Sequence, residues 1–153
     1  MIFTENWIPN DKNLYKINKL LNAMKRQNIT YGQPLEKQIG FSRAVRIGNI
    51  IAVTGTAPIA KNGIAAFPGD VYNQSKRCFE IIKDVLEKAG ATLDDVIRTR
   101  LFFKDISTWK EAAKANGKMF SKILPACTFV GVSGFINPEW LVEIEADAVL
   151  RKK

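Results

Sequence analysis

The segment Leu141–Val149 alternates strictly between apolar and acidic residues, and this alternation limits how the chain can fold. Every second residue is apolar: Val142, Ile144, Ala146 and Ala148. The residues between them are acids: Glu143, Glu145 and Asp147. A period of two is typical of a strand that buries one face. Three acids on the other face repel one another unless cations offset them, so we look for chemistry on that face.

The length of 153 residues and the hydrophobic content of 46% suit one domain that buries a core without disulfides or a metal. No apolar run approaches the roughly 20 residues that span a bilayer, so we expect no membrane segment. The N-terminus lacks a basic stretch followed by an apolar one, as a secretory signal would have. The two cysteines, Cys78 and Cys127, are far apart, and we expect a cytoplasmic protein with both reduced.

Charge and composition exclude several kinds of function. The net charge of +8 is spread along the chain, apart from the basic residues 151–153 at the end. Because this positive charge is diffuse, it does not favour nucleic acid as a partner. The chain has no histidine, which excludes Ser-His-Asp triads and Cys-His dyads. Two isolated cysteines are a poor ligand set for zinc, so we expect no metal site. Proton transfer must therefore use carboxylates, Lys, Tyr, Cys, backbone groups or water.

Periodicity predicts an alternating order of helices and strands. We expect an amphipathic helix over 11–27, a polar connector over 27–34, and a hairpin of strands 41–47 and 50–54 around Gly48-Asn49. A short strand near 64–66 precedes a long helix from Asp70 to about residue 89 that includes Cys78 in its buried stripe. One helical turn at 92–95 precedes a strand over 96–103. A second long helix, with Trp109 facing inward, then leads to the strands 124–132 and 141–149.

This order predicts an α+β two-layer domain with both long helices on one face of the sheet. The other face, which we call the open face, is then uncovered. The residues expected there are Cys127, Phe129, Glu143 and Glu145, with Arg98, Arg100 and Phe102 on the central strand. Because charge and large aromatic side chains are mixed on this face, we expect copies of the chain to associate around a symmetry axis, with sites between subunits.

Four segments together resemble the Rid family, also called the YjgF/YER057c/UK114 family. They are Gly40–Val45, Val53–Gly55, Phe102–Asp105 and Val142–Ala146, and the resemblance extends over roughly residues 40–150. It implies a chorismate-mutase-like two-layer fold with a mixed sheet, and a homotrimer with clefts between subunits. We therefore divide the chain into an N-terminal extension with an amphipathic helix, 1–35, and a Rid-like domain, 36–153.

The resemblance also implies an activity and its residues. The best-known members hydrolyse reactive imines and enamines without a cofactor, and we expect no cofactor here. By resemblance, Glu143 corresponds to the glutamate that positions water, while Phe41, Thr54 and Gly55 shape the cleft. Cys127 stands where those members have an arginine that grips the substrate carboxylate, and a thiol cannot form that two-pronged salt bridge. We include Phe129 among the residues lining the cleft.

Two hypotheses follow, and the sequence leaves both open. The chain is either a hydrolase of small imines or enamines, with Glu143 at the centre, or a non-catalytic homotrimer that binds a small metabolite or a partner protein. RNA binding or cleavage is a third, weaker alternative, because Phe103 and Trp109 fall at core positions rather than on a stacking platform. One of Arg43, Arg98 and Arg100 could replace the missing cation, and Arg100 is the preferred candidate, although a structural ion pair explains it equally well.

Overall fold

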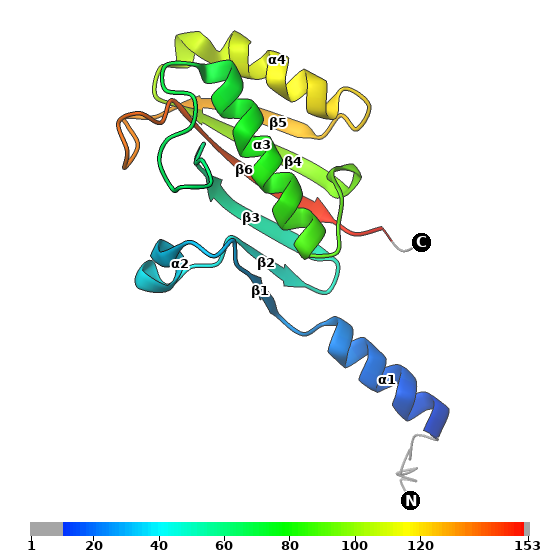
Figure 1. Ribbon diagram of the computed structural model, residues 1–153. Helices are drawn as coiled ribbons and strands as arrows, with labels where there is room; N and C mark the ends of the chain where they lie inside the picture. The colour runs from blue at the N-terminus through cyan, green and yellow to red at the C-terminus, as the bar shows by residue number, and fades with distance from the viewer. Residues whose placement is uncertain (1–10, 152–153) are drawn as a thin grey trace, which may run out of the picture.

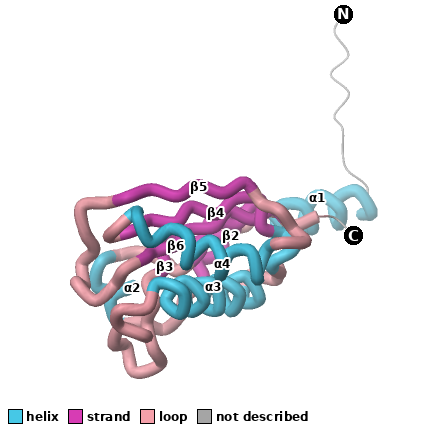
Figure 2. The backbone as a smooth tube through the Cα atoms, turned by 90° about the horizontal axis from the view of Figure 1, so that it is seen from above, coloured by secondary structure: helices cyan, strands magenta, loops and turns pink. Residues whose placement is uncertain are grey.

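The computed structural model describes residues 11–151, which form a six-stranded mixed sheet with two long helices on one face (Figures 1 and 2). The strand order is β1-β2-β3-β6-β4-β5. Their bounds are β1 Gln27–Ile29, β2 Ala44–Ile47, β3 Ile50–Thr56, β4 Val96–Phe103, β5 Ala126–Gly131 and β6 Val142–Val149. Neighbouring strands are antiparallel except β4 and β5, which run parallel. The predicted two-layer α+β class is confirmed.

Helices α3 (Val71–Lys88) and α4 (Trp109–Phe120) cover the same face of the sheet. Asp70 caps α3 by accepting a 2.9 Å hydrogen bond from the backbone N–H of Asn73, as a residue at that position should. Phe79 of α3 and Phe120 of α4 meet edge to face with their ring centroids 5.4 Å apart. Each such ring taken out of water contributes about 1.5–3 kcal/mol. Cys78 is fully buried in this core, as predicted.

Strand β6 lies between β3 and β4, and its alternation decides which side chains face the helices. Its apolar residues are at most 1% exposed: Val142, Ile144, Ala146 and Ala148. The antiparallel register with β4 pairs Glu145 with Arg100 and Asp147 with Arg98 on the open face. The predicted acidic face therefore exists, and arginines of the neighbouring strand offset two of its three charges.

The N-terminal part differs from the prediction. Helix α1 (Asp11–Ala23) ends earlier than expected and projects from the sheet in Figure 1. The expected polar connector instead contains β1, which pairs with β2, and leads into a short helix, α2 (Pro34–Ile39). The sequence lacked an apolar stretch long enough to reveal β1, because three residues carry no periodicity. The expected strand near 64–66 is a single bridge between Ile59 and Ala65.

Two side chains lie on the opposite side from the one predicted. The parallel register pairs Cys127 with Thr99 and Phe129 with Leu101, and both partners are fully buried under the helices. Cys127 and Phe129 are therefore on the helix-covered face, not on the open face. Trp109, expected to face inward, does pack against Phe129 with the ring centroids 6.0 Å apart, although 42% of it stays exposed. The edge strand β5 lacks clear alternation, so the sequence did not fix its orientation.

Most of the remaining connections match the expectations. The expected turn before β4 is a 3-10 helix, η1 (Leu93–Asp95), whereas η2 (Ile106–Thr108), a second 3-10 turn before α4, was not predicted. The hairpin between β2 and β3 closes with Ile47 opposite Ile50, around Gly48 with φ of 62°. Among residues 11–151, every helix is too short or too polar to cross a lipid bilayer.

Candidate active site

A β-bulge in β3 shapes the candidate site. Val53 pairs with Ala146 and Thr56 pairs with Ile144, so β3 has one residue more than β6 over this stretch. The extra length falls at Thr54 and Gly55. Bulges bend a strand and redirect its side chains, and here the bulge lies beside the end of β6 that carries Glu143.

Gly55 lets the carboxylate of Glu143 lie directly against the backbone of β3. A methyl group built on Gly55 would be only 3.0 Å from Oε2 of Glu143. A side chain at this position would therefore force the carboxylate to shift by a few tenths of an ångström. Burial raises the pKa of Glu143, nearby Arg43 opposes that rise, and Glu145 adds to it by repulsion. The site thus holds a half-buried carboxylate that retains its proton more readily than an exposed one.

A cavity of about 520 Å³ opens in front of Glu143. Four of the predicted site residues line it together: Phe41, Thr54, Gly55 and Glu143. Most of the other lining side chains are apolar: Leu35, Ile39, Ala57, Ile59, Ile136 and Trp140. This volume falls in the range of small-molecule sites. The structure therefore gathers these four residues, which the sequence placed on two separate segments and on the last strand, around one space.

The arginine preferred from the sequence, Arg100, does not line this cavity. Its Nε donates to Glu145 at 2.8 Å and its Nη1 to Asp147 at 3.1 Å, across the open face. Arg98 lies 3.9 Å from the same Asp147 carboxylate. Of the three arginines considered, Arg43 is the one that lines the cavity with Glu143. Arg100 thus forms the structural ion pair that the sequence left open, and it lines a second hollow on the open face together with Phe41 and Thr54.

The other two predicted residues are also elsewhere. Cys127 is exposed on edge strand β5, and Phe129 packs against Phe103 and Trp109 beneath α4. Neither lines the cavity around Glu143 within one chain. A site that combined them with Glu143 would need a second copy of the protein.

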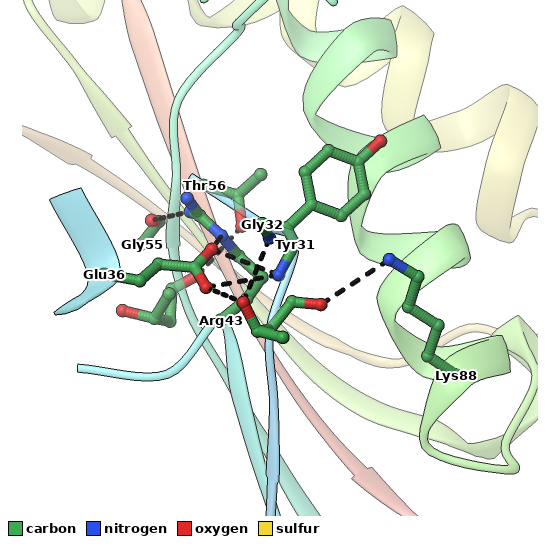
Figure 3. A network of polar contacts seen from close by, with 9 residues as sticks. Tyr31, Gly32, Glu36, Arg43, Gly55, Thr56 and Lys88 are labelled. Carbon is green, nitrogen blue, oxygen red and sulfur yellow. Dashed lines mark hydrogen bonds and ion pairs between the residues drawn. The ribbon is translucent and has the colours of Figure 1, made fainter. Parts of the chain in front are cut away.

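Arg43 is held by a buried carboxylate that the sequence analysis did not single out (Figure 3). Glu36 of α2 is 4% exposed, and its Oε1 lies 3.7 Å from Nε of Arg43. The Nη1 of Arg43 donates to the carbonyl of Gly55 at 3.3 Å. Burial lowers the pKa of Arg43, and the charges of Glu36 and Glu143 counteract this. One guanidinium thus connects α2 to the bulge that carries Gly55.

Glu36 also fixes the connector that precedes α2. It accepts a hydrogen bond from the Thr30 hydroxyl and another from the backbone N–H of Tyr31 at 3.1 Å. Tyr31 in turn donates its hydroxyl to Asp84 of α3 at 3.1 Å, and Lys88 lies over its ring. Pro34 at the start and Gly40 after the end were the available sequence signals for α2. The ion pair with Arg43 had no local signal, because it forms only in the tertiary structure.

Among residues 11–151 we find no group of three or more Cys, Asp or Glu side chains arranged to hold a metal ion. The ionisable groups that line the cavity are Arg43, Glu143 and Glu145. The chemistry that this arrangement offers is proton transfer by a carboxylate beside apolar and aromatic walls.

Comparisons with known proteins agree with this architecture. A family model described as endoribonuclease L-PSP matches residues 32–150. A RutC family protein of Pyrococcus abyssi is 33% identical over 123 residues, which are 80% of this chain and 96% of that protein. The crystal structure of Rv2704 from Mycobacterium tuberculosis, of the YjgF/YER057c/UK114 family, is similar with a TM-score of 0.75 and 39% identity, covering 82% of this chain and all of that one.

A putative endoribonuclease from Thermotoga maritima is similar with a TM-score of 0.70 and 27% identity, over 82% of this chain and 93% of that one. The class defined by the fold and the site is a small α+β protein with a one-sided sheet and an acid-bearing cavity. This chain belongs to the endoribonuclease L-PSP family, which includes the YjgF/YER057c/UK114 proteins. The family resemblance found in the sequence is confirmed.

Replacing Glu36 with Gln tests the buried ion pair. The amide keeps an acceptor for Tyr31 but leaves the buried guanidinium of Arg43 without its ion-pair partner, so we expect a loss of about 3 kcal/mol in unfolding free energy. Glu111→Gln is the matched control, because Glu111 pairs with Lys114 on the exposed side of α4 and should cost about 0.5 kcal/mol or less. Urea denaturation measures both. Equal losses in the two variants would show that the pair does not hold α2.

Replacing Glu143 with Gln tests the raised pKa. Folding makes this carboxyl harder to ionise, so its charge destabilises the native state above its unfolded pKa of about 4.3 and has no effect well below that pH. The variant cannot ionise. Its melting temperature relative to wild type should therefore be more favourable at pH 7.5 than at pH 3.5. A relative melting temperature that falls as the pH rises would mean that the carboxylate is stabilised by an ion pair instead.

Proposed function

We propose that this protein hydrolyses small imines or enamines in the cavity around Glu143. The observation that carries the proposal is the state of the Glu143 carboxylate. It lies half-buried against Gly55 in the cavity, and within residues 11–151 it forms no hydrogen bond or ion pair with another side chain. A carboxylate in this position is available to hold a water molecule and take its proton. Its raised pKa favours returning that proton later.

The reaction needs no group beyond water and this carboxylate. Glu143 accepts a proton from water while the water oxygen bonds to the carbon of the C=N group. Glu143 gives this proton to the nitrogen, which produces a carbinolamine. It then takes the proton of the carbinolamine hydroxyl and passes it to the nitrogen as the C–N bond breaks, so that ammonia or an amine leaves as the carbonyl forms. An enamine first takes a proton at carbon to become the imine. Thr54 and Gly55, which line the same cavity, would orient the substrate beside this water.

Two observations weigh on the alternatives. By the family resemblance, Cys127 corresponds to the carboxylate-gripping arginine, which supports a branch of the family that lacks this arginine and handles other substrates. The carboxylate of Glu143, which lines the cavity without an ion pair among the described residues, repels phosphate, so the cavity does not favour RNA despite the description of the family model. A non-catalytic homotrimer that binds a metabolite or a protein is the alternative if no turnover is found.

Imine hydrolysis can be measured directly. An amine oxidase and a pyridoxal-phosphate lyase generate, respectively, a carboxylate-free imine and 2-aminoacrylate, and carbonyl release is followed above the spontaneous rate. We expect acceleration of at least one substrate by the wild type. Glu143→Gln should lower the rate by about 100-fold or more, because it removes the only proposed base. Gly55→Ala should lower it as well, by displacing the carboxylate.

Glu111→Gln is the control and should retain the wild-type rate. Cys127→Arg restores the missing cation, so turnover of 2-aminoacrylate gained only in this variant would place the natural substrate outside the 2-imino acids. If no form of the protein accelerates either substrate, the hydrolase proposal is wrong and the binding alternative takes its place.

We also propose that the protein forms a homotrimer through the open face of the sheet. Several side chains that are apolar yet solvent-exposed in one chain support this: Ile50 (60%), Ile97 (53%) and Val130 (40%). The ion pairs of Arg100 with Glu145 and Asp147 lie on the same face. Apolar surface interrupted by paired charges is typical of an interface between subunits. The number of subunits rests on the family resemblance.

Native mass spectrometry at micromolar concentration should show a species of three times the chain mass. Val130→Lys places an unpaired charge on the open face and should shift the population to single chains. Leu14→Lys makes the same kind of change on α1, away from the sheet, and should leave the trimer intact. A wild-type protein found only as single folded chains would contradict the proposal.

A further inference from the structure

The charges that line the cavity are unequally available to a ligand. Within the described part of the chain, three ionisable side chains line it: Arg43, Glu143 and Glu145. The ion-pair partner of each side chain matters, because a charge already neutralised by a neighbour does little to select a ligand. The outcome decides whether the cavity attracts an anion or a cation.

Arg43 is already occupied. It is 6% exposed, it pairs with Glu36 at 3.7 Å and it donates to the carbonyl of Gly55. The ring of Phe41 lies 5.6 Å from the guanidinium carbon. Its Nε has no hydrogen-bond partner among the described residues, but this atom has almost no exposed surface, so a ligand cannot reach it. A ligand carboxylate would have to displace Glu36, which is itself buried.

Glu145 is occupied as well. Its Oε2 accepts from the Nε of Arg100 at 2.8 Å, and Arg100 also binds Asp147 on the open face. The charge of Arg100 therefore largely cancels the charge of Glu145 in the field that reaches the cavity. Among the described residues that line the cavity, Glu143 is then the one charge without an ion pair, and Arg43 acts on it only at longer range.

The rest of the cavity suits an apolar molecule with a positive charge. Phe41 and Trp140 contribute aromatic surface, which attracts cations as well as apolar groups. Leu35, Ile39 and Ile136 form an aliphatic rim that is exposed in one chain. An anionic ligand would approach Glu143 at short range in a partly desolvated space, where repulsion is stronger than in water.

We infer that this cavity selects a small apolar ligand with a protonated C=N group, an iminium or an amidinium, and excludes ligands that carry a carboxylate. This inference rests on the proposed function for the chemistry at the C=N group, and it narrows the substrate to imines of carboxylate-free amines. The absence of a cation from position 127 then has a physical explanation, because the ligand of this protein carries no carboxylate for a cation to bind.

Three probes of nearly equal shape separate the charge preference from catalysis. Benzamidinium, benzamide and benzoate carry charges of +1, 0 and −1, and none of them is a substrate for hydrolysis under the conditions of a titration. Calorimetry with the wild type should show benzamidinium binding at least about tenfold more tightly than benzoate, with benzamide between them. Glu143→Gln should remove most of this difference, while Glu111→Gln should preserve it.

Benzoate binding as tightly as benzamidinium, or more tightly, would overturn the inference and make Arg43 an anion receptor. Failure of all three probes to bind at millimolar concentration would overturn it too. The proposed hydrolysis fails separately: a clear preference for benzamidinium without any imine turnover keeps the inference and rejects the activity. Turnover of 2-aminoacrylate together with tighter benzoate binding keeps the activity and rejects the inference.

Discussion

Strand β6 is the constraint on which the other elements depend. It pairs with β3 on one side and β4 on the other, and its apolar residues form part of the core under α3 and α4. A shift of one residue would place Glu143 and its neighbouring acids in that core, so the register is strongly specified. The same alternation delivers the acids to the open face. Two of them meet arginines there, and Glu143 is left beside the bulge of β3.

The site therefore arises from two departures from regular structure. The bulge at Thr54 and Gly55 brings backbone without a side chain against Glu143, and the buried pair of Glu36 with Arg43 holds α2 as one wall. A buried ion pair contributes little net stability compared with apolar packing, but breaking it is costly. Its effect here is to place α2 and to neutralise the one guanidinium that lines the cavity. Among the described residues that line the cavity, the charge without an ion pair is then the carboxylate of Glu143, the candidate catalytic group.

Much of the fold and part of the candidate site could be predicted from the sequence. The helix α3 with its Asp70 cap, the hairpin around Gly48, strand β4 and the open-face position of Arg100 follow from local patterns that the tertiary structure reinforces. The resemblance to the family also placed Phe41, Thr54, Gly55 and Glu143 in one site, and they do line one cavity. Predictions were wrong on the edge strand β5, because an edge strand with weak alternation can present either face.

What the sequence alone determined is the two-layer class, the acidic face of the last strand and the lack of histidine chemistry, because these depend on local periodicity and composition. Only the tertiary structure decided which charges are neutralised. Glu36 lies on α2 and Arg43 seven positions later, just before β2, and Arg100 meets Glu145 across 45 residues. Such pairings depend on distances that folding sets, since charges far apart along the chain interact strongly only when the fold brings them within a few ångströms.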